Sequence, residues 1–345
     1  MKILFTGPRD IHATQALERA LFATNDVRTE AIIVDWNDAK DSRKKNYAEF
    51  HFKKKKGVLA VLSWQYFLYK KLKYHQPDVV FNMSALSFVS IFIYSLFRKV
   101  KIVYDCRDYL AYSYKFNRIL KCSIRVFDNL TAMLSYAIII PDHFGKTYFN
   151  LVNVSKLHVI YNSVQDHGIR KKYEEGPIRI GYLGYLSTYR NIEAIFKFVK
   201  NNPNIELHIA CTYISDKLKD VIPKLENIFL YERLKHVDAQ KLLAKMDYCL
   251  LTYDPNLGNY KYIQPTKFYD CMALGLPYIC SKGMVNLEKH VNSTSLNISN
   301  DYNSSVFPNL IKTDFSVYNS RVYTSTYSYD SILNHYRQIV EELLK

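Results

Sequence analysis

The sequence has little glycine and no cluster of cysteines. Among its 345 residues are 10 glycines and 6 cysteines. Scarce glycine, with no internal repeat period, argues against folds built on repeated glycine turns. The cysteines are scattered, mostly within apolar runs, and no C-x-x-C or Cys/His cluster occurs. Neither a zinc site nor a disulfide framework is therefore indicated, and the composition fits a reducing cytosol.

Signals for export and membrane insertion are lacking or interrupted. The N-terminal residues MKILFTG lack the long apolar core of a signal peptide. Residues 79–97 are nearly free of charge and long enough to resemble a membrane span. Asn82 and Ser84 interrupt this run, so we predict a strand at 79–81 and a buried helix at 85–99. A membrane span is the alternative.

Acidic residues are fewer than basic ones, 32 against 47, and the formal net charge at pH 7 is +15. From Phe50 to Pro77 there are seven lysines and no acidic residue. Such an excess suits phosphate-rich partners or an anionic membrane. Residues 58–72 have apolar side chains at helical spacing with lysines at both ends, which is typical of an interfacial helix. A core helix with solvated lysine ends fits the same pattern.

The length suits two domains of about 150 residues each. Strand and helix patterns alternate in two successive series of similar size. The first series begins with a strand at 2–6 and the second with a strand at 178–183. No G-x-G-x-x-G follows the first strand, so no dinucleotide site is predicted there. We expect an N-terminal domain at 1–166, a linker at 167–176, a C-terminal domain at 177–328 and a terminal amphipathic helix at 329–345.

The most informative stretch is Pro265–Pro277, PTKFYDCMALGLP. A proline fits the first turn of a helix but not its interior. Apolar residues then recur at helical spacing and can face a core. Gly275 followed by Pro277 is typical of a helix end. Residues 278–280 continue as a short buried strand, so the stretch predicts a helix followed at once by a strand.

The N-terminus of this predicted helix suits a phosphorylated ligand. Its unpaired amides and partial positive charge attract phosphate, and Lys267 adds a full charge. Thr266 is expected to help cap the exposed amides. Asp270, one turn further on, can accept hydrogen bonds from sugar hydroxyls. Phosphate at the tip and hydroxyls one turn down match a nucleotide diphosphate, whereas a surface helix with an ordinary proline start and glycine stop is the alternative.

The same stretch resembles the nucleotide-sugar site of GT-B glycosyltransferases, in particular glycosyltransferase family four. That family carries a pattern close to P-x-K-x-x-E-x-x-A-x-G-x-P in its C-terminal domain. Asp270 replaces the glutamate here, and Tyr262 stands where the family often has a second glutamate. The resemblance implies two Rossmann-like domains facing a central cleft, with the C-terminal helix crossing back to the first domain.

A second, weaker resemblance lies in the strand-glycine turn GYLGYLSTYRN at residues 181–191. Gly184 matches the family's glycine, Tyr185 replaces its usual arginine, and Arg190 stands at the place of its usual lysine. The resemblance implies that Arg190 and Lys267 bracket a pyrophosphate from two sides. A solvated residue at the start of a helix is the alternative for Arg190. Tyr253 lies in the loop that wraps the donor sugar in the family.

The resemblance also assigns residues in the N-terminal domain. Arg107 and Asp108 follow a predicted strand at 101–104, at the position where related enzymes often place a pair near the donor sugar and the acceptor. A local salt bridge that fixes the loop is the alternative. The predicted catalytic residues are Arg107, Asp108, Arg190 and Lys267. The residues predicted to bind the nucleotide sugar are Gly184, Tyr262, Pro265, Thr266 and Asp270.

The implied function is transfer of a sugar from a nucleotide-diphosphate donor to a glycan or lipid-linked glycan in cell-surface polysaccharide synthesis. The resemblance implies a retaining, metal-independent reaction with no cofactor, in the cytoplasm or at the inner face of the membrane. One alternative is a basic protein that binds nucleic acid or membranes on a degenerate GT-B fold. No nucleic-acid motif supports it, and the lysines cluster beside an apolar helix. A nucleotide-sugar epimerase or hydrolase is another alternative, but no acid/base pair is identified for it.

Overall fold

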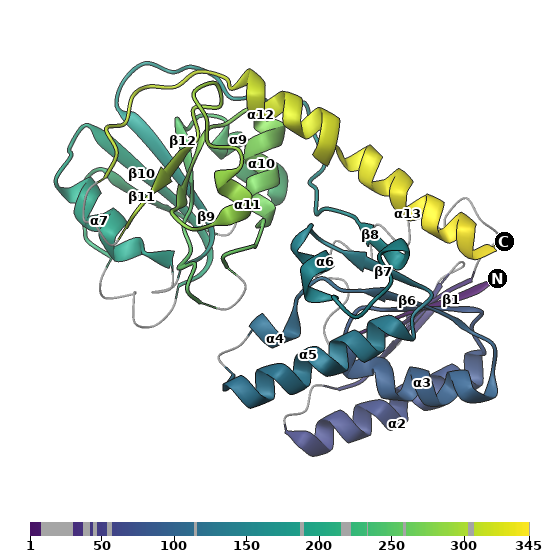
Figure 1. Ribbon diagram of the computed structural model, residues 1–345. Coiled ribbons are helices and arrows are strands. Elements are labelled where there is room, and N and C mark those ends of the chain that lie inside the picture. Colours follow the sequence, from purple (N-terminus) through teal and green to yellow (C-terminus); the bar gives the residue numbers. More distant parts are fainter. Residues whose placement is uncertain are drawn as a thin grey trace. The chain divides into compact units, whose positions relative to one another are not determined.

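The protein forms two compact units in this computed structural model (Figure 1). The structure describes residues 1–7, 30–36, 42–43, 47–53, 57–113, 116–186, 190–214, 222–232, 234–257, 260–302 and 307–344. The first unit comprises Met1–Tyr161 and Asp330–Lys345, and the second comprises Asn162–Tyr329. The chain thus returns to its first unit at the end, and the change between units falls a few residues before the linker expected at 167–176.

The first unit is built on an eight-stranded sheet with the order β3-β4-β2-β1-β5-β6-β7-β8. All neighbouring strands are parallel except the short β3, which runs antiparallel to β4 at one edge. The strands are β1 (Lys2–Gly7), β2 (Glu30–Asp35), β3 (Ser42–Arg43), β4 (Tyr47–His51), β5 (Val79–Asn82), β6 (Lys101–Asp105), β7 (Ala137–Ile140) and β8 (Leu157–Val159). Near-continuous apolar runs form β1, β5 and β7 because a parallel sheet is buried on both faces.

Three helices cover one face of this sheet and lie side by side in Figure 1: α2 (Val58–His75), α3 (Phe88–Phe97) and α5 (Arg118–Met133). Trp64 of α2 and Ile91 of α3 pack against Leu4, Val80 and Ile102 of the sheet. Shorter helical segments are Ala85–Ser87, α4 (Leu110–Ser113), α6 (Phe144–Tyr148) and Val154–Lys156. The strand predicted at 79–81 is confirmed, and a helix follows it as predicted. That helix is not buried as expected, because Leu96 and Phe97 on its outer side are 64% and 74% exposed. No helix in the described part of the chain has the length and hydropathy needed to cross a bilayer.

The last helix, α13 (Tyr329–Leu344), packs on the opposite face of the first sheet. Its buried side chains include Tyr336 and Val340, which join Phe5, Phe81 and Val103 in one apolar core. Residues spaced at helical intervals form this contact, as the amphipathic pattern predicts. The prediction that the C-terminal helix crosses back to the first domain is therefore confirmed.

The second unit is a six-stranded parallel sheet with the order β11-β10-β9-β12-β13-β14. Its strands are β9 (Ile178–Leu186), β10 (Ile205–Ile214), β11 (Ile228–Tyr231), β12 (Tyr248–Leu251), β13 (Tyr278–Ser281) and β14 (Ile298–Asn300). Its helices are α7 (Ile192–Lys200), α9 (His236–Leu243), α10 (Thr266–Leu274), α11 (Val285–Glu288), α12 (Val317–Val322) and the adjoining π-helical turn Tyr323–Tyr327. Strand β9 runs past Gly184, where the sequence predicts a turn, because its pairing with β10 resumes after an irregularity opposite that glycine.

Candidate functional site

Helix α10 is the buried central helix of the candidate site. Every residue from Phe268 to Leu274 is buried, so the alternative of a surface helix is wrong. Pro265 is the N-cap residue in an extended conformation, and no side chain caps the helix. The expectation that Thr266 helps cap it is therefore wrong, because the capping position belongs to a proline, which has no side-chain oxygen. The amide of Phe268 donates to the carbonyl of Pro265, and the amides of Thr266 and Lys267 before it keep their capacity to bind an anion.

Lys267 lies in the first turn of α10 and reaches strand β9. Its ammonium nitrogen is 4.6 Å from the ring centroid of Tyr182. A Cβ atom at Gly184 would lie 3.0 Å from both Cε and Nζ of Lys267, and Gly184 has a φ of +97°. A side chain at position 184 would therefore displace the ammonium group and strain the backbone. The structure brings together two of the predicted residues in this way, one on a strand and one on a helix.

Arg190 lies two residues before α7, and its guanidinium group lies over an aromatic ring. Its guanidinium carbon is 3.7 Å from the ring centroid of Tyr253. The Nη1 atom is buried and has no hydrogen-bond partner among the described residues. Arg190 is partly buried, so the alternative of a solvated helix-start residue is wrong. A buried N–H group without an acceptor is costly, and a bound anion would relieve that cost.

The two cations lie close enough to repel one another. Burial and the nearby Arg190 lower the pKa of Lys267 to about 7. No carboxylate forms an ion pair with Lys267 or Arg190 in the part of the chain that the structure describes. Two neighbouring cations without a carboxylate counterion are unfavourable in the free protein and suit a ligand with several negative charges.

Asp270 lies one turn after Lys267 and is buried. Its Oδ1 atom is 2.9 Å from Nε2 of His236 and accepts a hydrogen bond of 2.9 Å from Nε2 of Gln240. The hydrogen bond with Asp270 raises the pKa of His236. The other carboxylate oxygen has no hydrogen-bond partner among the described residues. Contact between Asp270 and sugar hydroxyls stays a prediction, and this second oxygen is the atom that can make it.

Sequence reasoning missed His236 and Gln240. They lie four residues apart on one face of α9, the spacing that places two side chains beside the same neighbour. This spacing is the signal that the sequence offers, but nothing near it in the sequence indicates which carboxylate would contact this face of α9.

Tyr262 is partly buried, and its backbone carbonyl accepts a hydrogen bond of 2.5 Å from Asn286. Its role in binding the donor stays a prediction.

The remaining predicted residues, Arg107 and Asp108, belong to the first unit. Arg107 forms an ion pair of 2.7 Å with Asp105, and its guanidinium carbon lies 5.5 Å from the ring centroid of Tyr336. Tyr336 donates a hydrogen bond of 3.2 Å to Asp105. Arg107 thus takes part in a local salt bridge at the end of β6, with Asp105 as its partner, whereas the side chain of Asp108 is exposed. Their catalytic assignment stays a prediction.

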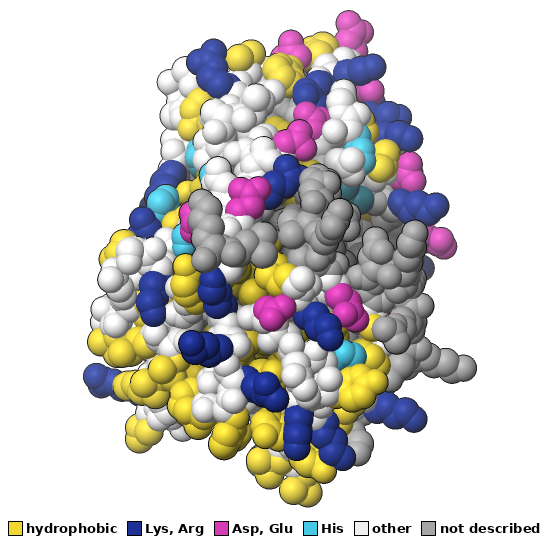
Figure 2. Space-filling model, turned by 90° about the vertical axis from the view of Figure 1, so that its right-hand side faces the viewer, with side chains coloured by type: hydrophobic (Ala, Val, Ile, Leu, Met, Phe, Trp, Pro, Cys, Tyr) yellow, Lys and Arg dark blue, Asp and Glu magenta, His cyan; other side chains and the backbone are white. Residues whose placement is uncertain are grey.

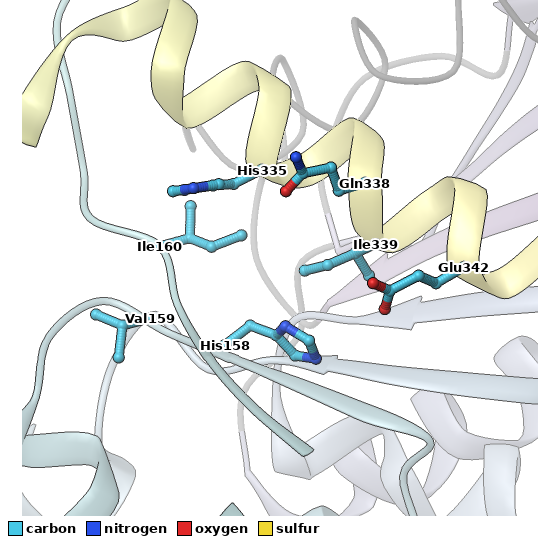
Figure 3. A pocket seen from close by; sticks show the side chains of 7 residues that line it. All are labelled: His158, Val159, Ile160, His335, Gln338, Ile339 and Glu342. Carbon is cyan, nitrogen blue, oxygen red and sulfur yellow. The ribbon is translucent and has the colours of Figure 1, made fainter. Parts of the chain in front are cut away.

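A pocket of the first unit lies elsewhere, between β8 and α13 (Figure 3). Its volume is about 160 Å³, and its lining residues are His158, Val159, Ile160, His335, Gln338, Ile339 and Glu342. Burial lowers the pKa of His158. Pockets for drug-sized ligands are usually about 300–1,000 Å³, and none of the predicted site residues lines this one. It therefore adds nothing to the candidate site.

Comparison with known proteins gives similarity in structure but not in sequence. No protein-family model matches the chain, and no curated protein does. Sucrose-phosphate synthase from Thermosynechococcus elongatus is similar over 100% of this chain and 99% of its own, with 9% identity and a TM-score of 0.77. HepE from Anabaena, crystallised with UDP-glucose, is similar over 99% and 100%, with 14% identity and a TM-score of 0.71.

The lipopolysaccharide outer core galactosyltransferase WaaB is also similar, over 100% of this chain and 99% of its own, with 15% identity and a TM-score of 0.64. These likenesses extend along the whole chain and both sheets. The protein has the GT-B fold. The predicted fold class is confirmed, and within it the cations Lys267 and Arg190 and the glycine at 184 lie together in the second Rossmann-like unit.

Proposed function

We propose that this GT-B protein is a glycosyltransferase that uses a nucleotide-diphosphate sugar. The observation that carries the proposal is the pair of cations, Lys267 and Arg190, beside the N-terminus of α10, with which no described carboxylate forms an ion pair. A diphosphate supplies the negative charge that this arrangement lacks. The structural likeness to HepE, which was crystallised with UDP-glucose, supports the same class of donor.

The reaction places its largest change of charge on the leaving diphosphate. Lys267, Arg190 and the amides at the start of α10 would stabilise that charge as preorganised donors. Because Gly184 has no side chain, the end of the Lys267 side chain can lie against it. The second oxygen of Asp270 would hold sugar hydroxyls and so orient the donor. With two cations at the diphosphate we expect no metal to be required, and we propose retention of the anomeric configuration on the family resemblance.

The acceptor we propose is a glycan or a lipid-linked glycan in cell-surface polysaccharide synthesis. The likeness to WaaB, named as a lipopolysaccharide outer core galactosyltransferase, supports this class of acceptor. Arg107 and Asp108 of the first unit are the proposed residues near the transferred sugar. A lipid-linked acceptor would keep the enzyme at the inner face of a membrane. The nucleic-acid-binding alternative predicts retention by DNA or RNA that responds to salt and not to nucleotides.

Calorimetric titration with UDP, GDP and ADP tests the donor site. We expect one nucleotide to bind clearly and Arg190→Gln to weaken its binding about 10- to 100-fold, because a charge-assisted contact to phosphate is lost. Lys200→Gln is the matched control, since that side chain is exposed at the end of α7 and should leave binding unchanged. The proposal would be contradicted if none of the three nucleotides bound, or if Arg190→Gln and Lys200→Gln bound the nucleotide with equal affinity.

Donor binding should also depend on pH through Lys267. Its pKa in the free protein is about 7, and a bound phosphate favours the charged ammonium. Above pH 7 the free protein has lost the proton that the complex keeps, so affinity should fall by up to about tenfold per pH unit. Lys267→Arg keeps its charge at every pH and provides the baseline for titration of the nucleotide itself. An identical pH profile for both proteins would show that this lysine does not bind the phosphate.

A further inference from the structure

The outer side of helices α2, α3 and α5 exposes many large apolar side chains. Leu59 is 77% exposed, Phe97 74% and Ile119 81%. Other apolar side chains of these helices with substantial exposure are Leu62, Tyr66, Val89, Ile93, Leu96, Leu120, Val126, Leu130 and Met133. We call this surface the three-helix face. Phe88 of α3 and Phe127 of α5 meet edge to face, and α2 contacts α3, so the three helices form one continuous layer.

Basic side chains are interleaved with the apolar ones on the three-helix face. The exposed cations on or directly beside its helices are Lys70, Lys73, Arg98, Lys99 and Arg118. Figure 2 shows the lower part of the molecule, where these helices lie, covered mainly by hydrophobic and basic side chains. A contiguous exposed apolar surface of this kind marks a site of interaction in soluble proteins.

Helices α2, α3 and α5 carry no exposed acidic side chain among their described residues. Helices α2 and α3 contain no acidic residue. The single acid of α5, Asp128, is 0% exposed and accepts hydrogen bonds from Tyr104 and Tyr148 beneath the helix. Asp78, in the turn between α2 and β5, is the exposed acid beside these helices, and it accepts a hydrogen bond from the backbone amide of Lys2. The described residues of the three helices themselves are therefore apolar and cationic, with one exposed acid at the edge of the face.

We propose that the three-helix face binds the surface of an anionic lipid bilayer. Exposed leucine, isoleucine and phenylalanine side chains can enter the boundary between headgroups and acyl chains, while lysine and arginine bind the anionic headgroups. Tyr66 has the amphipathic side chain that favours this boundary, and its ring lies 4.4 Å from the ammonium of Lys70. The contact lies on the surface of the membrane and does not cross it.

Charge and apolarity together favour a bilayer over other partners. A second copy docked face to face would bring lysine and arginine against lysine and arginine, which is repulsive. Nucleic acid would satisfy the cations but leave the leucine and phenylalanine side chains exposed. An anionic bilayer satisfies both kinds of side chain. The inference deepens the proposed function, on whose membrane location it rests, by naming the surface that makes the contact; that surface consists of first-unit residues and requires no nucleotide.

Co-sedimentation with vesicles tests the proposal on the full chain. One vesicle type is phosphatidylcholine alone, and the other contains about 30% phosphatidylglycerol. We expect the protein to sediment with the anionic vesicles only and added salt to weaken binding. Removing three cations should weaken it about 100-fold, at roughly fivefold for each lysine or arginine at the surface. The charge variant combines Lys73→Gln, Lys99→Gln and Arg118→Gln.

Three further triple variants separate the face from general surface properties. The apolar variant removes one exposed side chain from each helix and combines Leu62→Ser, Leu96→Ser and Leu130→Ser. The apolar control changes exposed side chains of the second unit and combines Leu230→Ser, Ile311→Ser and Val317→Ser. The charge control combines Lys197→Gln, Lys200→Gln and Lys245→Gln, all exposed in the second unit.

We expect the face variants to lose vesicle binding, both control variants to retain it, and all four to melt close to the wild-type temperature. Nucleotide titration should be the same in all four, so failure of the membrane proposal and failure of the donor site are distinguishable. Equal loss in face and control variants would overturn the proposal. A dimer detected by light scattering and abolished by the apolar variant would instead assign the face to a second copy. Retention by nucleic acid that only the charge variant loses would also overturn it.

Discussion

Replacing Lys267 by methionine is expected to abolish nucleotide-sugar transfer while making the ligand-free protein more stable. The ammonium is the one full positive charge in the first turn of α10, and loss of such a donor to the leaving diphosphate should lower kcat/KM about 1,000-fold. The gain in stability arises because burial and Arg190 lower the pKa of Lys267 from 10.5 to about 7. Its charged form is therefore unfavourable in the folded state.

The sign of the pH dependence follows from these two pKa values. Below pH 7 the lysine is charged in both folded and unfolded protein, and the fold bears the full cost of that charge. Between pH 7 and 10.5 the unfolded chain keeps a proton that the folded protein has lost, so wild-type stability rises with pH. Lowering the pKa from 10.5 to about 7 corresponds to up to about 5 kcal/mol, so Lys267→Met should be more stable by up to that amount at pH 6, and the advantage should vanish above pH 10.5.

Urea denaturation at several pH values, together with donor titration, measures both effects. The exposed Lys200 provides the control, and Lys200→Met should change neither donor binding nor the pH dependence of stability. If Lys267 instead stabilised the fold, its substitution would lower the free energy of unfolding, because a structural partner would be lost. Lower stability of Lys267→Met at pH 6, with donor binding kept, would thus show that the lysine supports the second unit and not the ligand.

The helix and strand at the centre of the site could be predicted because their signals are local. Pro265 precedes the first helical residue, and Gly275 adopts the left-handed conformation that ends α10. The strand predicted at 278–280 follows as β13, which is one residue longer. The proline acts as the N-cap, one position earlier than a first-turn residue. Such boundaries depend on a few dihedral angles of neighbouring residues, so short sequence patterns determine them well.

The contacts between side chains could not be predicted from these patterns. Gly184 is important because the lysine of α10 passes over it, a contact that depends on the way the helix packs beside β9. Asp270 meets a helix face that begins 34 residues earlier in the chain. Arg107 pairs with Asp105 instead of its sequence neighbour Asp108, because Tyr336 returns from the far end of the chain to the same carboxylate. Each of these depends on contacts between residues distant in sequence.

Replacing Gly275 by alanine is expected to lower the stability of the second unit by roughly 4 kcal/mol. Its φ is +65°, and a Cβ atom would lie 2.2 Å from Cε2 of Phe315. The backbone amide of Ser316 donates a hydrogen bond of 2.8 Å to the carbonyl of Gly275, which holds the Phe315 segment against the end of α10. With the backbone held there, the ring can retreat only by leaving its present side-chain torsions, so the substitution combines backbone strain with overlap.

Two comparisons separate the strain from the overlap. Gly168 has a φ of +71° and no atom within 4 Å of its Cβ position, so Gly168→Ala measures the strain alone, about 1 kcal/mol. Adding Phe315→Ala to Gly275→Ala removes the overlap. It should recover most of the stability that Gly275→Ala loses beyond the loss in Gly168→Ala, although removing the Phe315 ring has its own cost in stability. The free energies of unfolding in urea give all three values. If Gly275→Ala were no less stable than Gly168→Ala, the Phe315 segment would move freely. The end of α10, and with it the position of Lys267 at its start, would then be set by the buried face of the helix alone.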